Sequence, residues 1–127
     1  MYYIQKKWTN AKKQEYNGYL YDSKFEASYA QELDLRLKAK DIKGYDRQVN
    51  LDLIVNGYLV CQYRIDFIVY HNDGTVEYVE LKGLYSQMFI FKFKLFEALY
   101  SDKPDVKITI IEQGKFNRPK SKKQKYA

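Results

Sequence analysis

Three charged side chains lie in two neighbouring segments that read as strands. Asp66 lies inside the alternating segment 58–70, and Glu80 and Lys82 end the next segment. Residues two apart in a strand share a face, so Glu80 and Lys82 are expected to point the same way. Asp is poorly suited to a strand interior, which makes Asp66 a candidate functional residue. The alternative is a salt bridge from Asp66 to Arg64 or to a lysine.

The turn between the two segments predicts how their acidic side chains meet. Residues 72–74, Asn-Asp-Gly, are expected to form a three-residue loop with Gly74 in the left-handed conformation. The strands then pair in a register that sets Asp66 opposite Glu80, with Cβ atoms about 4.5–5.5 Å apart. Two carboxylates this close repel each other unless a cation lies between them. Oxygen ligands select a hard ion, so the pair predicts a Mg²⁺ site in which Mn²⁺ can substitute.

Glu26 is a third candidate acid, on a helix predicted from about residue 22 to residue 40. On a helical wheel it falls in the middle of the apolar stripe. A carboxylate on a buried face is costly unless it is paired or bound to a metal. The alternative is structural, because Ser23 and Glu26 have the spacing of a capping box at the start of the helix.

Gln48 is expected beside Asp66 if the hairpin of segments 47–55 and 58–70 has one irregularity. Asn56-Gly57 predicts a tight turn, but a strict two-residue turn would put the apolar face of strand 47–55 on the side of Asp66. One extra residue or a bulge restores the buried face and sets Gln48 opposite Asp66. The alternative is a solvated strand glutamine.

The expected elements follow one another in the order α-β-β-β-α-β. They are a helix at about 22–40, strands at 47–55, 58–70 and 75–82, a helix at 86–101 and a strand at 105–112. Alternation within 86–101 would also fit a strand, but the length of the segment favours a helix. The order predicts an α/β fold with a mixed sheet flanked by helices, in which the last strand joins the third in parallel through a helical crossover.

The composition suits one domain with a polyanionic partner. The chain has 127 residues, of which 46% are hydrophobic, and a net charge of +6. The positive excess is concentrated at the two ends of the chain. We expect a single domain over residues 1–112 and a basic tail over 113–127. Solubilising ends are the alternative to a nucleic-acid contact.

Other classes of protein are disfavoured. Cys61 is the one cysteine of the sequence, so an internal disulfide is excluded, and no Cys/His cluster suggests zinc. No apolar run reaches the roughly 18 residues of a membrane span, and the N-terminus lacks the apolar region of a secretory signal. We therefore expect a cytoplasmic protein without a membrane partner.

The ordered set of motifs resembles the PD-(D/E)XK nuclease superfamily, which combines a helix Glu, a mid-strand Asp and a Glu-x-Lys at the end of the next strand. Three stretches are similar to a phage-encoded family of predicted nucleases within it. They are residues 16–26, 64–67 and 80–83, the last followed by 91–96. The resemblance spans about residues 12–112. Ile65 stands where the proline that names the motif would be.

This resemblance implies a restriction-endonuclease-like core and a role for each motif residue. Asp66 and Glu80 would hold Mg²⁺, with the backbone carbonyl of Leu81 as a further ligand. Lys82 would orient or activate the attacking water and stabilise charge on the phosphate. Glu26 would bind the metal through water or assist a second ion.

Gln48 matches an auxiliary polar position of the superfamily, and basic side chains are expected to contact DNA. The basic residues are Lys12, Lys13, Arg64, Lys92, Lys94, Lys120, Lys122 and Lys123. A homodimer is expected, because enzymes that cut junctions usually need two active sites. Met88 and Phe91, with Phe89 and Phe93, are expected to form part of its interface or, alternatively, buried core.

The resemblance thus implies a Mg²⁺-dependent DNA endonuclease that is structure-selective for branched or Holliday-junction-like DNA in phage DNA processing. If the protein is phage-encoded, it would act in the cytoplasm of the bacterial host. A non-catalytic DNA-binding or interaction protein on the same scaffold is the first alternative. A small-ligand binder or chaperone-like protein that uses the basic surface is the second.

Overall fold

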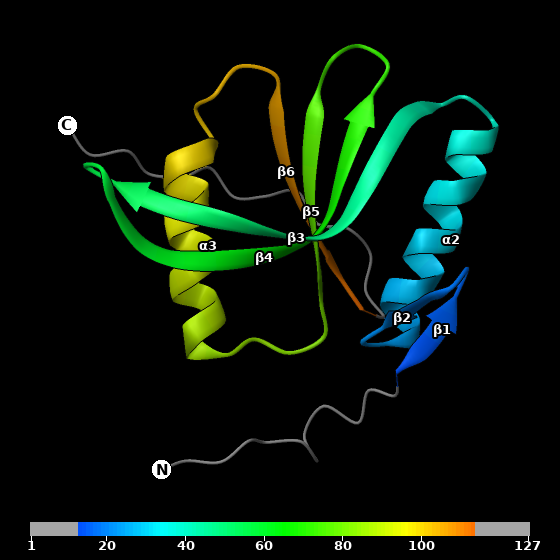
Figure 1. The fold of residues 1–127 in the computed structure, drawn as a ribbon, viewed down its shortest axis with the longest axis horizontal. Coiled ribbons are helices and arrows are strands. Elements are labelled where there is room, and N and C mark those ends of the chain that lie inside the picture. Colours follow the sequence, from blue (N-terminus) through cyan, green and yellow to red (C-terminus); the bar gives the residue numbers. More distant parts are fainter. Residues whose placement is uncertain (1–12, 114–127) are drawn as a thin grey trace.

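The computed structural model describes residues 13–113, and Figure 1 shows their arrangement. The elements are β1 (Gln14–Tyr16), β2 (Tyr19–Tyr21), α2 (Lys24–Lys38), β3 (Ile42–Val55), β4 (Tyr58–His71), β5 (Val76–Lys82), α3 (Gln87–Tyr100) and β6 (Val106–Glu112). A four-stranded mixed sheet has the order β3-β4-β5-β6, in which only β6 runs parallel to its neighbour. The predicted α/β fold and its α-β-β-β-α-β order are confirmed.

A small hairpin, β1–β2, precedes this core and was not predicted as a pair of strands. Asn17 and Gly18 connect the two strands with φ values of 52° and 83°, as a two-residue hairpin turn requires. The Asn-Gly signal was therefore present in the sequence. The end of the hairpin leads directly to Ser23, whose hydroxyl accepts a hydrogen bond from the Glu26 backbone and caps α2.

Hairpin β3–β4 contains the predicted irregularity. Near the turn Val55 pairs with Tyr58, whereas farther along Val49 pairs with Ile65 after a register shift at Leu53 and Ile54. The bulge keeps Val49 and Leu51 on the buried side, as expected. β3 begins at Ile42, five residues before the predicted start at 47.

Simple alternation along 58–70 predicts one shared face for Leu59, Cys61, Tyr63, Ile65, Phe67 and Val69, and the structure shows that this prediction is wrong. Phe67 and Val69 pack in a core cluster with α2, whereas Tyr63 and Ile65 pack with Phe96 of α3. β5 pairs with β4 only from Phe67 onward. The turn end of the β3–β4 hairpin therefore has no β5 partner and curls over α3, as Figure 1 shows. Strand twist makes such a change of face possible in long strands that extend beyond their neighbours.

The loop between β4 and β5 has the predicted geometry. Gly74 has a φ of 94°, and the amide of His71 donates a hydrogen bond to the carbonyl of Thr75. Tyr70 pairs with Val76 and Phe67 with Val79, so the predicted register is confirmed over residues 67–70, and Asp66 and Glu80 lie directly beyond the last pair. After α3 crosses over, β6 lies parallel to β5, which also confirms the expected pairing.

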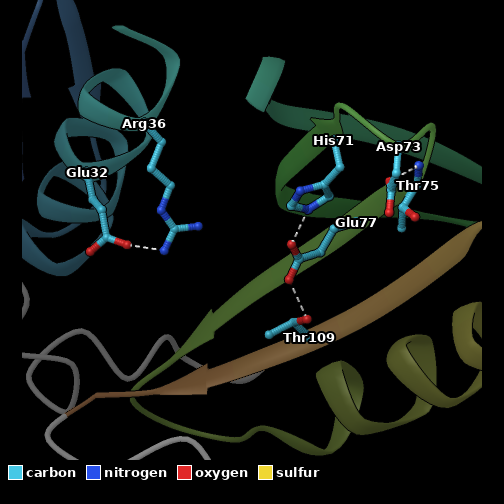
Figure 2. Close-up of polar contacts among 7 residues, drawn as sticks. All are labelled: Glu32, Arg36, His71, Asp73, Thr75, Glu77 and Thr109. Carbon is cyan, nitrogen blue, oxygen red and sulfur yellow. Dashed lines mark hydrogen bonds and ion pairs between the residues drawn. The ribbon is translucent and has the colours of Figure 1, made fainter. Parts of the chain in front are cut away.

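On the α2 side of the sheet, the buried carboxylate of Glu77 links three strands. It accepts a hydrogen bond from the Thr109 hydroxyl at 2.6 Å and lies 2.7 Å from Nε2 of His71, as Figure 2 shows. Glu77 is three residues from Glu80 and therefore points to the other face of the sheet. Within residues 13–113, no helix combines the length and the apolar character needed to cross a membrane.

Candidate active site

A cleft of about 340 Å³ opens where the curled part of β4 separates from β5. It gathers residues from α2, β3, β4, β5 and α3. All five residues that the sequence placed at the centre of the chemistry line it: Glu26, Gln48, Asp66, Glu80 and Lys82. Arg64, Leu81 and Lys92, also named from the sequence, line the same cleft.

Asp66 and Glu80 point into this cleft from adjacent strands. Oδ2 of Asp66 accepts a hydrogen bond of 2.8 Å from the backbone amide of Leu81, which fixes the orientation of the carboxylate. Burial, together with the charge of Glu80, raises the pKa of Asp66 to about 8. Burial likewise raises the pKa of Glu80. Two adjacent acids that resist ionisation mark a site suited to a compensating cation.

Glu80 is held from two directions. The hydroxyl of Tyr63 donates a hydrogen bond to Oε1, and Nζ of Lys82 lies 3.5 Å from Oε2. Only 4% of Glu80 is exposed. Sequence reasoning missed Tyr63, because simple alternation along β4 put it on the face opposite Asp66.

Lys82 rests on an aromatic ring. Its Nζ lies 3.8 Å from the ring centroid of Phe89, near the start of α3, within the range of a cation–π interaction. The ring of Phe89 also contacts that of Tyr63, with centroids 6.4 Å apart. The side chains that hold Glu80 and Lys82 therefore support each other. No local sequence signal identifies Phe89 as the partner of Lys82.

Gln48 connects Glu26 to β4. Its side-chain amide lies 3.5 Å from Oε1 of Glu26, and its carbonyl accepts a hydrogen bond of 2.5 Å from Arg64. Gln48 has a φ of 50°, a left-handed conformation that is strained for a residue with a side chain. The backbone kink occurs where Gln48 passes Asp66, between the pairs of Arg47 with Phe67 and Val49 with Ile65.

Glu26 serves both as a helix-start residue and as a lining residue. Its backbone amide bonds to the Ser23 hydroxyl, but its carboxylate is directed at Gln48 in the cleft. Burial, followed by the charge of Asp66, raises the pKa of Glu26 to about 7. Glu26 is half-buried and lines the same cleft as Asp66 and Glu80.

The remaining basic residues named from the sequence are dispersed. Lys92 is half-buried in the cleft, whereas Lys13 and Lys94 are exposed and do not line it. The others, Lys12, Lys120, Lys122 and Lys123, lie outside the described residues. The boundary proposed at residues 112 and 113 coincides with the end of β6 at Glu112, but most of the basic tail lies beyond the described part.

The donor set fits a hard, partly hydrated ion. Among residues 13–113, no group of three or more His, Cys, Asp or Glu side chains is arranged to chelate a metal. The cleft instead offers the Asp66–Glu80 pair with the Leu81 backbone beside it. Mg²⁺ keeps several waters and commonly takes only one or two carboxylates together with substrate phosphates.

Comparison with known proteins gives a family. No curated protein matches the chain. The match to one family model extends over residues 5–118, which includes every element described above. By that match, the chain belongs to the family described as "Protein of unknown function (DUF1064)".

Proposed function

We propose that this protein is a Mg²⁺-dependent endonuclease that hydrolyses DNA phosphodiester bonds, on a scaffold of the PD-(D/E)XK kind. The observation that carries the proposal is the convergence of Asp66, Glu80 and Lys82 in one cleft. The half-buried carboxylate of Asp66 and the buried carboxylate of Glu80, from adjacent strands, supply hard oxygen ligands. A lysine 3.5 Å from one of them supplies a positive charge for the phosphate or the water.

Each residue would have a defined task. Asp66, Glu80 and the Leu81 carbonyl would hold the ion, and Mn²⁺ would substitute for Mg²⁺. When bound, the ion lowers the pKa of a water molecule and stabilises negative charge on the phosphate. Lys82 would orient that water and offset charge on the scissile phosphate. Glu26 would hold a water molecule at the edge of the site, with Gln48 fixing its carboxylate.

The basic side chains would bind the DNA backbone. Arg64 and Lys92 lie in the cleft itself, where they would contact phosphates next to the cut. Lys13, Lys94 and the lysines of the chain ends would contribute contacts farther away, with a strong dependence on salt. A homodimer acting on branched DNA remains part of the proposal, since two linked sites can cut two strands.

The experiment compares two buried acids of the same strand. Glu80 and Glu77 are both on β5 and are 4% and 7% exposed, but only Glu80 lines the cleft. We expect wild-type protein and Glu77→Gln to cleave labelled junction, flap or duplex DNA with Mg²⁺, and Glu80→Gln and Asp66→Asn to be at least about 100-fold slower. EDTA should abolish cleavage and Mn²⁺ should restore it.

Two outcomes would count against the proposal. Metal-independent cleavage, or equal loss in Glu77→Gln and Glu80→Gln, would separate the activity from this cleft. DNA binding without cleavage of any substrate by wild-type protein would favour the alternative of a non-catalytic DNA-binding protein.

A further inference from the structure

An apolar strip borders the cleft on the side of α3. It consists of the exposed residues Leu84, Tyr85, Met88 and Phe91, from the loop after β5 and the first turns of the helix. Met88 is 63% exposed and also lines the cleft, and Phe91 is 70% exposed. Because they are three residues apart in a helix, Met88 and Phe91 are neighbours on its surface. Several large apolar side chains exposed together beside a cleft mark a contact surface.

The core leaves Met88 and Phe91 of this strip exposed, whereas the ring of Tyr85 packs against that of Phe89. α3 buries Phe93 and Phe96 against β4 and β5, and the half-buried Phe89 supports Lys82. Met88 and Phe91 lie on a different side of the same helix and remain open. Of the residues expected in a core or an interface, Phe89 and Phe93 therefore belong to the core, and Met88 and Phe91 are exposed.

The charges beside the strip favour a nucleic acid over a protein as its partner. Lys92 lies four residues after Met88 on the same side of α3, and it is half-buried in the cleft, which Met88 and Lys82 also line. A protein packed over Met88 and Phe91 would take these ammonium groups out of water, which is costly without matched anions. A DNA strand offers both chemistries, because its phosphates pair with lysines and its bases stack on apolar and aromatic side chains.

We propose that the apolar strip receives unstacked bases next to the phosphate held in the cleft. The substrate class is then DNA with unpaired nucleotides beside the cut, such as a flap, a junction or a boundary between single and double strands. In continuous duplex the bases are stacked inside the helix and cannot reach Phe91. This inference rests on the proposed nuclease function. It adds that the enzyme selects its substrate by the unpaired nucleotides beside the cut.

The first test measures the ratio of kcat/KM on a flap to kcat/KM on continuous duplex of the same sequence. Phe91→Ser should lower this ratio at least about 5-fold, and Phe91→Trp should restore it, because stacking on an aromatic ring contributes strongly for each base. Leu35→Ser is the matched control. Leu35 is 64% exposed on α2 and does not line the cleft, so its replacement should leave the ratio as in wild type.

The second test measures binding without cleavage. A flap carrying 2-aminopurine at its unpaired nucleotide is mixed with the Glu80→Gln protein, with and without the Phe91→Ser change. We expect the fluorescence change on binding to be lost with Phe91→Ser and kept with Leu35→Ser. If wild-type protein cuts no DNA but this response depends on Phe91, the strip is supported while the nuclease function fails.

Two results would overturn the inference. The first is an unchanged cleavage ratio in Phe91→Ser together with an unchanged 2-aminopurine response. The second is a wild-type dimer, seen by sedimentation, that becomes a monomer in Phe91→Ser. That result would assign the strip to a second copy of the chain.

Discussion

At the scale of single residues, Glu80 and Lys82 each depend on an aromatic side chain from another element. Tyr63 of β4 donates a hydrogen bond to Glu80, and the ring of Phe89 lies beneath the ammonium group of Lys82. Both aromatic residues line the cleft and contact each other. They restrict the rotamers of the acid and the lysine, so that these groups are oriented before a substrate binds.

The Tyr63→Phe variant isolates the hydrogen bond to Glu80. The ring and its packing remain, while the donor is lost; hydrogen bonds to charged groups contribute about 1.5–3 kcal/mol. We expect single-turnover cleavage at low Mn²⁺ to fall about 10- to 100-fold, and high Mn²⁺ to recover part of the rate. Tyr78→Phe is the control, because its half-buried ring packs against Phe96 without lining the cleft. Equal losses in both variants would assign the effect to general packing.

The Phe89→Leu variant isolates the ring beneath Lys82. A cation–π interaction contributes about 0.5–2 kcal/mol, so we expect the single-turnover rate on saturating DNA to fall about 2- to 30-fold. Phe89→Trp should keep the rate within about twofold of wild type, since it retains a ring. In the background of Lys82→Ala, Phe89→Leu should have no further effect. A further loss there would show that Phe89 does not act through Lys82.

At the scale of elements, the two faces of β5 carry buried acids with opposite properties. Glu80 faces the cleft, where burial raises its pKa. For Glu77 on the other face burial also acts upward, but the Thr109 hydroxyl and His71 outweigh it and lower the pKa. The neighbours of Glu77 therefore stabilise its charged form, whereas at Glu80 burial outweighs the contacts with Tyr63 and Lys82. This contrast makes Glu77 a structural residue and Glu80 a candidate ligand.

The Glu77→Gln variant should show a pH-dependent loss of stability. Because the pKa of Glu77 is lower in the folded protein than its ordinary value of 4.5, ionised Glu77 stabilises the fold above pH 4.5. That contribution is lost as the pH falls through the lower, folded-state value. We expect the free energy of unfolding to decrease by about 1–3 kcal/mol at pH 7, and the difference from wild type to shrink at pH 4 and below, as measured by urea denaturation.

Glu32→Gln is the control for this prediction. Glu32 pairs with Arg36 on the exposed side of α2 (Figure 2), and exposed ion pairs contribute about 0–1 kcal/mol. Its loss should therefore be smaller than that of Glu77→Gln at pH 7. If Glu77→Gln is as stable as wild type, the link between β4, β5 and β6 is not a stabilising one.

At the scale of the whole molecule, the position of the cleft follows from how the sheet is covered. α2 packs on one face near β3 and β4, and α3 packs under the curled hairpin (Figure 1). The cleft opens between these two cores, where Asp66 marks the change of face along β4. An ion bound there would contact strands on both sides of that junction and should stabilise the entire fold.

Metal binding should therefore be visible in the unfolding temperature. An ion that binds only the folded protein adds about 2.7 kcal/mol at 100 times its Kd, so the Tm in Mg²⁺ or Mn²⁺ should exceed that in EDTA. The increase should disappear in Asp66→Asn and persist in Glu77→Gln, as measured by differential scanning calorimetry. The same increase in Asp66→Asn would place the ion elsewhere.

Much of the local geometry could be predicted from the sequence. Asn56-Gly57, Gly74 and Ser23 identified two hairpin turns and a helix start, and all three have the expected conformations. The register of β4 with β5 over residues 67–70 followed from loop length, and Asp66 and Glu80 lie directly beyond these pairs and line the same cleft. Turn chemistry and strand alternation act over a few residues, so they can be read along the chain.

The sequence by itself determined the order of the elements. It also determined that Asp66, Glu80 and Lys82 lie close together, because both features depend on short-range spacing. Only the tertiary structure decided that Tyr63 and Phe89 hold them and that Gln48 adopts a left-handed backbone. The physical reason is that β3 and β4 curl where their pairing with β5 ends. This curl brings Tyr63 into contact with Glu80, which is 17 residues away in the sequence. Such a curl arises from packing on α3, and no local pattern encodes it.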